Sequence, residues 1–492
     1  MICVSIARTR HRMMIAEHQA LAQRGAKLVE LRIDWLSSNP DIPRLLKDRP
    51  TPVILTCRRA ADGGKWHGTE EERQRLLRTA IVSGVEYIDL EDDIAKSIPK
   101  YGKTKRIVSH HDFNGTPDHL EEIWAEMAEM KPDIIKLVTL ASSPSDCFRV
   151  LSLIKNARIP TVAFCMSEFG AWSRIVCAKL GAPFSYAAFS PDRQVAPGQL
   201  PFQDMQEIYA YDSINADTKL FGVIGDPIGH SLSPLLHNKM MRKIGFNGVY
   251  VPIRVTADQL PRALDDLTEL DFCGLSVTIP HKEAVLAAYP NCEEVVKQIG
   301  AANTLARDDK NEWQTSNTDY EAALESVKLG LKPGETLDGK RVLLLGAGGA
   351  ARAIGMGIVR AGGALAISSR TSARAKTLST ELGCRHVTWE NRGAEYADIL
   401  INCTPVGMYP NMDDTPFQDH WLREGMIVFD TIYTPENTLL IKQAQGRGCT
   451  TITGVEMFIR QAAAQFERFT GQSASLDELR DTLRRGISAA RG

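Results

Sequence analysis

Eight short β-rich runs recur along the first half of the chain, and the gaps between them are long enough for helices. The runs are ICVSIA at 2–7, LVELRID at 28–34, VILTCR at 53–58, YIDLED at 87–92, RIVSHHD at 106–112, DIIKLV at 133–138, TVAFCM at 161–166 and PFSYAAF at 183–189. Strands that alternate with helices form parallel sheets. Eight such units in about 200 residues predict a (β/α)8 barrel. The count alone leaves an open doubly wound sheet as the alternative.

Polar residues at the C-terminal ends of these strands are candidate site residues, because a barrel places its active site there. Those ends and the loops after them carry Glu30, Arg32, Arg58, Asp62, His111, Lys136, Ser167, Arg174 and Gln199. Lys136 is the clearest signal, since it lies inside the apolar run DIIKLVTL. Burial and nearby cations make a lysine nucleophilic toward ketones, whereas the alternative is a lysine that reaches the strand end or pairs with Glu30. His111 suits general acid–base work, and its alternative is a hydrogen-bonded histidine at a strand end.

The clearest local motif of the second half is RVLLLGAGGAARAIGMGIV at 341–359. A buried strand meets a glycine-rich turn and then a helix of small residues. These glycines permit a tight turn and the close approach of a pyrophosphate to the helix N-terminus, with Ala351 at the third position of the fingerprint. The alternative is a turn of the same kind without a ligand. The candidate cofactor residues in this turn are Gly346, Ala347, Gly348, Gly349 and Ala350.

The strand after this motif, ALAISSR, indicates which dinucleotide is bound. A protein that binds NAD usually carries Asp or Glu at the end of this strand for the ribose 2′-hydroxyl. Here the chain has Ser369, Arg370 and Thr371, with Arg374 one helical turn after Arg370. Two arginines and a threonine favour a 2′-phosphate and therefore NADP(H). The alternative is that these arginines are only the exposed start of a helix.

Several motifs of the first 210 residues together resemble type I 3-dehydroquinate dehydratase: VELRID, CRRAADGG, SHHDF, the strand lysine, SEFGAWSR and APGQ. The resemblance implies that Lys136 forms an imine with the substrate's C3 ketone and that His111 removes the C2 proton. Asp62, which orients His111, stands where the family usually has glutamate, and Val195 stands where it often has serine. The residues implied to bind the carboxylate and hydroxyls are Arg174, Glu30, Arg32, Arg58 and Gln199.

A second set of motifs, over about residues 219–480, resembles shikimate 5-dehydrogenase: GHSLSP, VTIPHK, GAANT, NTD, GAGGAAR, SSRT, INCTPVGM, DTIYTP and GVEMFIRQAA. It implies a catalytic pair, Lys282 and Asp319, beside the nicotinamide. The implied substrate residues are Ser231, Ser233, Thr278, Asn303, Tyr433 and Gln461, and the further cofactor residues are Thr404, Met408 and Gly454. Ser276 stands where the family commonly has asparagine. Before Pro234, Ser233 also has the pattern of a helix N-cap.

The stretch from Ala196 to Pro234 is therefore predicted to join two enzymes. The expected domains are a barrel over 1–212, a shikimate-binding domain over 219–335 completed by helices over 454–492, and a Rossmann-type NADP domain over 336–453. The expected reactions are dehydration of 3-dehydroquinate to 3-dehydroshikimate and its reduction to shikimate with NADPH. Two alternatives stay open: a second half that oxidises quinate with NAD, and a metabolite-sensing regulator without catalysis.

Composition narrows the class of protein. The formal net charge of −2, without a basic run, gives no support to nucleic-acid binding. No apolar run reaches transmembrane length. Ten cysteines without a Cys-x-x-Cys pair or a zinc spacing predict a reduced, cytoplasmic protein and no metal site. Small molecules are the expected partners, and nothing in the sequence fixes an oligomeric state.

Overall fold

The computed structural model describes residues 1–489 of the chain, so the last three residues of the helical segment expected at 454–492 lie outside the described residues. It divides into two compact units. One holds Met1–Gly222, Pro227–Gly229 and Asn247–Phe272, and the other holds Val223–Asp226, His230–Phe246 and the chain from Cys273 onward. Over the described residues, no helix is long and apolar enough to cross a membrane.

The eight runs of the first half all form parallel strands of one sheet. They are β1 (Ile2–Ile6), β2 (Leu28–Arg32), β3 (Val53–Thr56), β4 (Tyr87–Glu91), β5 (Lys105–Asp112), β6 (Ile134–Leu140), β7 (Thr161–Met166) and β8 (Ser185–Ala188). Their order is β7-β6-β5-β4-β3-β2-β1-β8. The last strand thus pairs with the first, with Cys3 opposite Tyr186. A doubly wound sheet reverses its order in the middle, whereas this order is sequential throughout, so the barrel prediction is confirmed.

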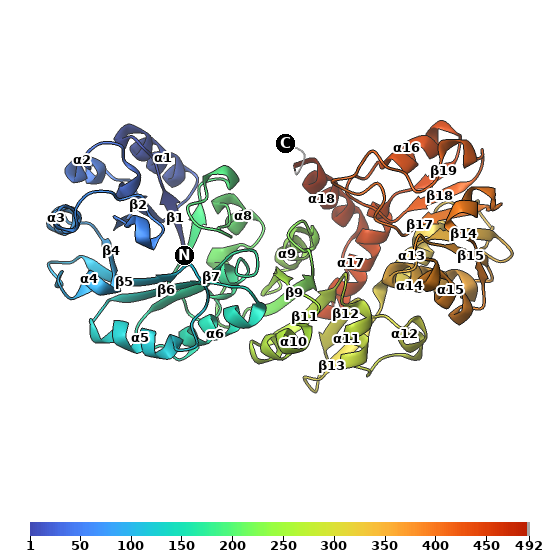
Figure 1. Ribbon diagram of the computed structural model, residues 1–492, viewed down its shortest axis with the longest axis horizontal. Helices are drawn as coiled ribbons and strands as arrows, with labels where there is room; N and C mark the ends of the chain where they lie inside the picture. The colour runs from blue at the N-terminus through green and yellow to red at the C-terminus, as the bar shows by residue number, and fades with distance from the viewer. Residues whose placement is uncertain (490–492) are drawn as a thin grey trace. The chain divides into compact units, whose positions relative to one another are not determined.

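The helices of this part lie between consecutive strands and on the outside of the ring in Figure 1. They are α1 (His11–Gln23), α2 (Ile42–Leu46), α3 (Glu70–Val82), α4 (Asp92–Ala95), α5 (Leu120–Glu129), α6 (Pro144–Lys155), α7 (Ser173–Val176) and α8 (Phe202–Glu207). Thr69 and Ser143 cap α3 and α6 by accepting backbone N–H groups, and each is part of a capping box. Local sequence thus fixes where these helices begin.

The inside of the barrel is layered because side chains alternate between the two faces of a strand. One layer is apolar and packs into a single cluster that includes Cys3, Leu28, Ile54, Ile107, Ile134, Val162 and Phe184. Two residues further along the same strands, toward their C-terminal ends, polar side chains replace the apolar ones: Ser5, Glu30, Thr56, Ser109 and Lys136. The register sets Ser109 beside Lys136. The candidate site is therefore a buried polar layer on an apolar floor.

A mixed five-stranded sheet follows, with the order β10-β9-β11-β12-β13. Its strands are β9 (Lys219–Gly225), β10 (Gly248–Arg254), β11 (Phe272–Val277), β12 (Thr304–Arg307) and β13 (Trp313–Ser316). Strands β11, β12 and β13 pair antiparallel. The helices that accompany it are α9 (Ser233–Lys243), α10 (Leu260–Glu269), α11 (Lys282–Ala288), α12 (Glu294–Ile299) and α13 (Thr318–Lys328).

The third sheet has six parallel strands in the order β16-β15-β14-β17-β18-β19. They are β14 (Arg341–Leu345), β15 (Ala364–Ser368), β16 (Arg385–His386), β17 (Ile399–Asn402), β18 (Ile427–Asp430) and β19 (Thr450–Ile452). In chain order this is 3-2-1-4-5-6, the order of dinucleotide-binding folds, with the ligand crevice between β14 and β17. Helices α14 (Gly349–Arg360) and α15 (Ser372–Glu381) lie on one side of the sheet and α16 (Leu439–Gly446) on the other (Figure 1).

Two helices close the described chain, α17 (Gly454–Thr470) and α18 (Leu476–Ala489). Helix α17 packs against α13 and β12 of the preceding elements.

The prediction that Ser233 is an N-cap is wrong, because α9 begins at Ser233 and its N-cap is Leu232. The hydroxyl of Ser231, two residues earlier, accepts the backbone N–H of Ser233 at 3.3 Å instead. Pro234 occupies the first turn of α9, where a missing N–H costs nothing.

Candidate active sites

Lys136 lies at the centre of the polar layer in the barrel and is only 5% exposed. Its Nζ donates to Asp89 Oδ2 at 3.1 Å and lies 3.8 Å from Glu30 Oε1. The ammonium also sits 4.1 Å from the centre of the Tyr186 ring. The ion pair with Glu30 considered from the sequence is thus present, but Asp89 is the nearer carboxylate. A buried lysine with a charge partner and an adjacent aromatic face is a candidate nucleophile.

His111 lies on the same inward face of β5 as Ser109, whereas His110 turns the other way and bonds Asp92 at 2.7 Å. An Arg58 guanidinium nitrogen lies 3.0 Å from His111 Nδ1. Since guanidinium has no acceptor, Nδ1 accepts this hydrogen bond, and the ring is neutral. Burial, and then the charges of Arg58 and Lys136, hold the pKa of His111 well below its usual range. The ring is therefore neutral, and its basic nitrogen is Nδ1, the nitrogen that faces Arg58.

Two further candidate residues are Arg174 on α7 and Gln199 on the loop after β8. Arg174 is 1% exposed, lies over the Phe164 ring and donates to the Pro197 carbonyl at 3.4 Å. Its Nε has no hydrogen-bond partner among the described residues, and burial lowers its pKa to about 10. A buried guanidinium without a carboxylate is suited to receive an anion. Gln199 bonds the Ser5 hydroxyl at 3.4 Å and so reaches the same layer.

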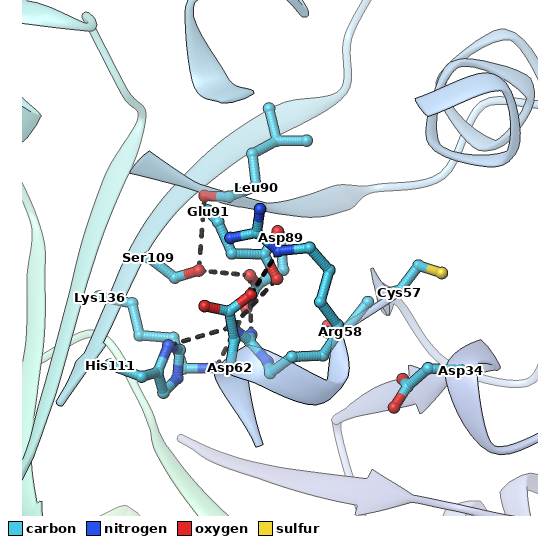
Figure 2. A network of polar contacts seen from close by, with 12 residues as sticks. Asp34, Cys57, Arg58, Asp62, Asp89, Leu90, Glu91, Ser109, His111 and Lys136 are labelled. Carbon is cyan, nitrogen blue, oxygen red and sulfur yellow. Dashed lines mark hydrogen bonds and ion pairs between the residues drawn. The ribbon is translucent and has the colours of Figure 1, made fainter. Parts of the chain in front are cut away.

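Arg32 and Asp62 lie at the edge of this network. Arg32 forms a two-pronged pair with Asp34 at 2.9 and 3.0 Å. Asp62 lies on the loop after β3 and accepts a hydrogen bond from Arg59 at 2.6 Å. Figure 2 shows the Asp62 carboxylate on the side of the network that carries His111. No hydrogen bond joins it to His111 in residues 1–489. Its role in orienting His111 stays a prediction.

The sequence analysis missed three residues of this network, Asp89, Glu91 and Ser109. Asp89 joins Arg58 at 2.9 Å, Ser109 at 2.6 Å and Lys136 at 3.1 Å (Figure 2). Glu91 pairs with Arg58 at 3.4 Å and with Arg73 at 2.6 Å. The available signal was YIDLED, in which two acids occupy alternate positions of a strand and therefore the same face.

In the second half, Lys282 and Asp319 form an ion pair at 2.6 Å. Lys282 begins α11, and Asp319 lies in the first turn of α13, where Asn317 caps the helix. A Cβ added to Gly349 would lie 3.1 Å from Lys282 Cδ. The glycine-rich turn therefore packs against the stem of this lysine. The pair predicted as catalytic is thus assembled next to the candidate cofactor loop.

Hydrogen bonds join Ser276 on β11, Asn303 just before β12 and Gln465 on α17. Gln465 accepts from the Ser276 hydroxyl at 2.8 Å and donates to the Asn303 carbonyl at 3.0 Å. The Asn303 side chain bonds Thr318, next to Asp319. Gln465 thus holds Asn303 and Thr304 where β12 begins.

Of the remaining candidate substrate residues, Ser233 is buried, and Ser231, Thr278, Tyr433 and Gln461 are partly buried. Tyr433 stacks on Phe458 with ring centres 4.2 Å apart, and Gln461 donates to the Phe458 carbonyl at 3.1 Å. The Thr278 backbone N–H bonds the Ile224 carbonyl at 3.0 Å, which fixes the loop after β11. These contacts involve the backbone or other protein groups, so the roles of these side chains toward substrate stay predictions.

The glycine-rich turn fits a dinucleotide. Gly346 has φ of +120°, and a Cβ there would lie 2.9 Å from the Cys403 carbonyl oxygen, so a side chain is excluded. A Cβ on Gly348 would meet open space at the start of α14. That space is where a pyrophosphate approaches in this fold. Ala351 is fully buried against the sheet, as the third fingerprint position requires.

The residues after β15 suit a 2′-phosphate. Arg370, Thr371 and Arg374 are all exposed, and Ser369 accepts the Thr371 backbone N–H at 3.3 Å. No acid occurs in SSRTSARA. The two exposed arginines after β15 therefore fit NADP(H) better than NAD(H).

The loops after β17 and β18 are tied together by two residues that the sequence analysis missed. Asn402 accepts from the Thr404 backbone and hydroxyl at 2.9 and 2.7 Å and donates to Asp430 at 3.0 Å. Asp430 also accepts from Thr438, the N-cap of α16, at 2.7 Å. Burial raises the pKa of Asp430 to about 6.

Met408, further along the loop after β17, is 45% exposed. Over the described residues, no cluster of His, Cys, Asp or Glu could hold a metal ion.

Comparison with protein families accounts for both halves. The model of type I 3-dehydroquinase matches residues 2–216. The shikimate dehydrogenase substrate-binding domain matches 223–305, and the shikimate 5′-dehydrogenase C-terminal domain matches 454–484. The chain is 36% identical to the chloroplastic bifunctional 3-dehydroquinate dehydratase/shikimate dehydrogenase of Arabidopsis thaliana, over 96% of this chain and 82% of the relative.

Solved structures resemble the second half. Shikimate 5-dehydrogenase of Thermus thermophilus, in complex with NADP(H) and shikimate, is 32% identical over 55% of this chain and all of its own, with a TM-score of 0.50. Quinate dehydrogenase of Corynebacterium glutamicum, in complex with NAD, is 30% identical over 55% of this chain and 99% of its own, also with a TM-score of 0.50. The fold is therefore shared by enzymes that are named for different substrates and cofactors.

Proposed function

Because the chain belongs to the family of bifunctional 3-dehydroquinate dehydratases/shikimate dehydrogenases, we propose that the two sites described above carry its two activities. The barrel dehydrates 3-dehydroquinate to 3-dehydroshikimate, and the second half reduces that product to shikimate with NADPH. The observation that carries the barrel assignment is the buried Lys136 between Asp89 and the Tyr186 ring. For the second half, it is the Lys282–Asp319 pair beside the cofactor turn.

In the barrel, Lys136 Nζ attacks the C3 ketone, and the ketone oxygen leaves as water to give an imine. The protonated imine draws electrons from C2, so that the unprotonated ring of His111 can remove the C2 proton. The C1 hydroxyl then departs as water with a proton returned by His111. A second water hydrolyses the imine and releases Lys136. Arg174, which has no acidic partner, binds the carboxylate.

The acid side of the pH profile tests the assignment of His111. Since the pKa of His111 is lowered, the base form is lost only as the pH falls through that lowered value. We expect kcat/KM for dehydration to stay level from neutral pH to well below pH 6.5, the ordinary value for histidine. An acid limb centred near 6.5 that disappears in His111→Gln would contradict the lowered pKa of His111, and a limb that is the same in His111→Gln would contradict its assignment as the base. His110→Gln, which alters the outward histidine, is the control and keeps the profile.

In the second half, the bound NADPH supplies the hydride. Lys282 protonates the ketone oxygen as the hydride arrives, and Asp319 holds the ammonium in place at 2.6 Å. Ser231, Ser233, Asn303 and Gln461 bind the carboxylate and hydroxyls of the substrate. The turn from Gly346 to Ala350 would hold the pyrophosphate of the cofactor, and Thr404, Met408 and Gly454 would hold its nicotinamide.

Cofactor preference depends on Arg370 and Arg374. The double change Arg370→Ala/Arg374→Ala should raise KM for NADP⁺ by at least about 100-fold, because each of the two hydrogen bonds to a charged group is worth about 1.5–3 kcal/mol. KM for NAD⁺ should stay the same, since NAD⁺ lacks the 2′-phosphate. Steady-state shikimate oxidation with both cofactors measures this. Arg385→Ala, an exposed arginine on β16, is the control. Equal changes for the two cofactors would contradict 2′-phosphate binding.

Quinate oxidation with NAD by the second half is the alternative activity, since the Corynebacterium neighbour is named for quinate and contains NAD. The two arginines and the absence of an acid in SSRTSARA favour shikimate dehydrogenase with NADP(H). Turnover of shikimate and quinate with each cofactor decides between them. The match to enzyme families over both halves argues against a regulator without catalysis.

One assay tests the whole proposal. Purified protein mixed with 3-dehydroquinate and NADPH should consume NADPH, since the product of the first site is the substrate of the second. Neither Lys136→Ala nor Lys282→Ala should do so, and mixing the two variants should restore consumption. No consumption by the unmodified protein would contradict the proposal. We also propose that the protein acts in the cytoplasm, although the Arabidopsis relative is named chloroplastic.

A further inference from the structure

Asp89 is the most buried acid near Lys136, and the mechanism above gives it no role. It is 2% exposed, and both of its oxygens are occupied. Oδ1 accepts from Ser109 at 2.6 Å and from Arg58 at 2.9 Å, while Oδ2 accepts from Lys136 at 3.1 Å (Figure 2). Of the groups around Lys136, it is thus the one that touches the nucleophile and the arginine in contact with His111.

The charges around Lys136 leave Asp89 as its main counter-ion. Ionisable groups face it from five other strands as well: Cys3 on β1, Glu30 and Arg32 on β2, Arg58 after β3, His111 on β5 and Tyr186 on β8. Glu30 lies 3.8 Å away, and its oxygens already accept from Ser5 and Thr56. Burial alone would raise the pKa of Asp89, but the charges of Arg58 and Lys136 outweigh it and hold that pKa well below its usual range. Asp89 is therefore anionic.

Imine formation leaves the charge at the lysine nitrogen unchanged. The ammonium and the ketone give a protonated imine and one water, so one positive charge sits on Nζ before and after the step. An unpaired charge in a buried site is costly. A carboxylate fixed 3.1 Å from Nζ therefore stabilises the resting lysine and also the protonated imine.

We propose that Asp89 is a positioning residue of the dehydratase site, the fixed counter-ion that keeps the imine on Lys136 protonated while the C2 proton is removed. Protonation matters because only the cationic imine accepts the electron pair from the C2–H bond. Arg58 and Ser109 hold the carboxylate from its other oxygen, so that it cannot turn away from Nζ. This inference rests on the proposed dehydration by Lys136.

The test is the alkaline limb of kcat for dehydration in Asp89→Asn. An opposite charge at this distance shifts a pKa by about 1–3 units. Without it, the imine loses its proton at a lower pH, and the alkaline limb should move down by at least about one unit. Asp89→Glu, which keeps the charge, should restore the limb even where kcat is reduced. An unchanged limb in Asp89→Asn would overturn the proposal, because a merely structural acid lowers kcat equally at every pH.

Glu91→Gln is the matched control, since Glu91 is a buried acid on the same strand that pairs with Arg58 but not with Lys136. The alkaline limb of kcat in Glu91→Gln should stay in place. A shift as large as that in Asp89→Asn would overturn the assignment to Asp89. Should Asp89→Asn fail to fold, Ser109→Ala keeps every charge and removes the 2.6 Å hydrogen bond to Asp89 together with the 3.4 Å hydrogen bond to the Leu90 carbonyl. The alkaline limb should then move down, because one of the two groups that hold the carboxylate beside Nζ is gone, and a limb that stays or moves up would contradict the inference.

Borohydride separates this inference from the proposed function. Unmodified protein treated with 3-dehydroquinate and borohydride should carry a reduced adduct on the Lys136 peptide. If it carries none, the proposed Schiff base itself fails. If it does, and Asp89→Asn is trapped with the same dependence on pH, only the role of Asp89 fails.

Discussion

Replacing Lys136 with alanine should lower kcat/KM for dehydration of 3-dehydroquinate by at least about 10³-fold, because the covalent step loses its nucleophile and no other described amine lies in the polar layer. Oxidation of shikimate by the same preparation should be unchanged, since that site is built from other residues. Formation of the conjugated ketone, followed by absorbance, measures the first activity. Asp89 still pairs with Arg58 in this variant, so the fold should be retained.

Two variants sharpen this prediction. Lys136→Arg keeps a positive charge near Asp89 but cannot form an imine, so it should be as inactive as Lys136→Ala. Lys100→Ala removes an exposed lysine that pairs with Asp133 and should have wild-type activity. Turnover of Lys136→Ala above a tenth of the wild-type rate would show that the reaction proceeds without a Schiff base.

Replacing Lys282 with alanine should lower kcat for shikimate oxidation by about 10²- to 10⁴-fold, the usual contribution of a general acid or base. The lysine is the proposed proton donor and acceptor at the reacting oxygen, and Asp319 holds it at 2.6 Å. KM for NADP⁺ should change little, because the ammonium faces the substrate oxygen and not the 2′-phosphate. Dehydration in the barrel should be unaffected.

Its controls use the same ion pair and the same region. Asp319→Asn leaves the lysine in place but removes its partner, so its loss should be smaller and should depend more strongly on pH. Lys297→Ala, an exposed lysine on α12, should match the wild type. If Lys282→Ala raised KM for NADP⁺ tenfold and left kcat intact, the lysine would be a cofactor ligand and not the proton donor.

The alternation of side chains along the strands was sufficient to predict much of the barrel site from the sequence. Lys136 stood out because a charged residue interrupts an apolar strand, and alternation along β5 places His111 on the inward face with Ser109. The glycine-rich motif with its flanking strand and helix likewise predicted the cofactor turn. In each case the signal is local, since a few neighbouring residues fix which face a side chain occupies.

Other features could not be read from local pattern. The Ser233 cap prediction failed because the helix begins one residue earlier than a capping serine allows, and the hydroxyl of Ser231 accepts the N–H instead. Asn402 and Asp430 looked like ordinary residues at strand ends. They tie two loops together only because β17 and β18 are adjacent and parallel.

By itself, the sequence determined the alternation of strands and helices, the two sets of motifs and the face on which each strand residue lies. Only the tertiary structure decided that β8 closes on β1 and that Asp89, not Glu30, is the nearest carboxylate to Lys136. Asp89 and Lys136 are 47 residues apart and meet across the inside of the barrel. A period of two residues tells which side chains point inward, but the curvature and register of the closed sheet decide which of them touch.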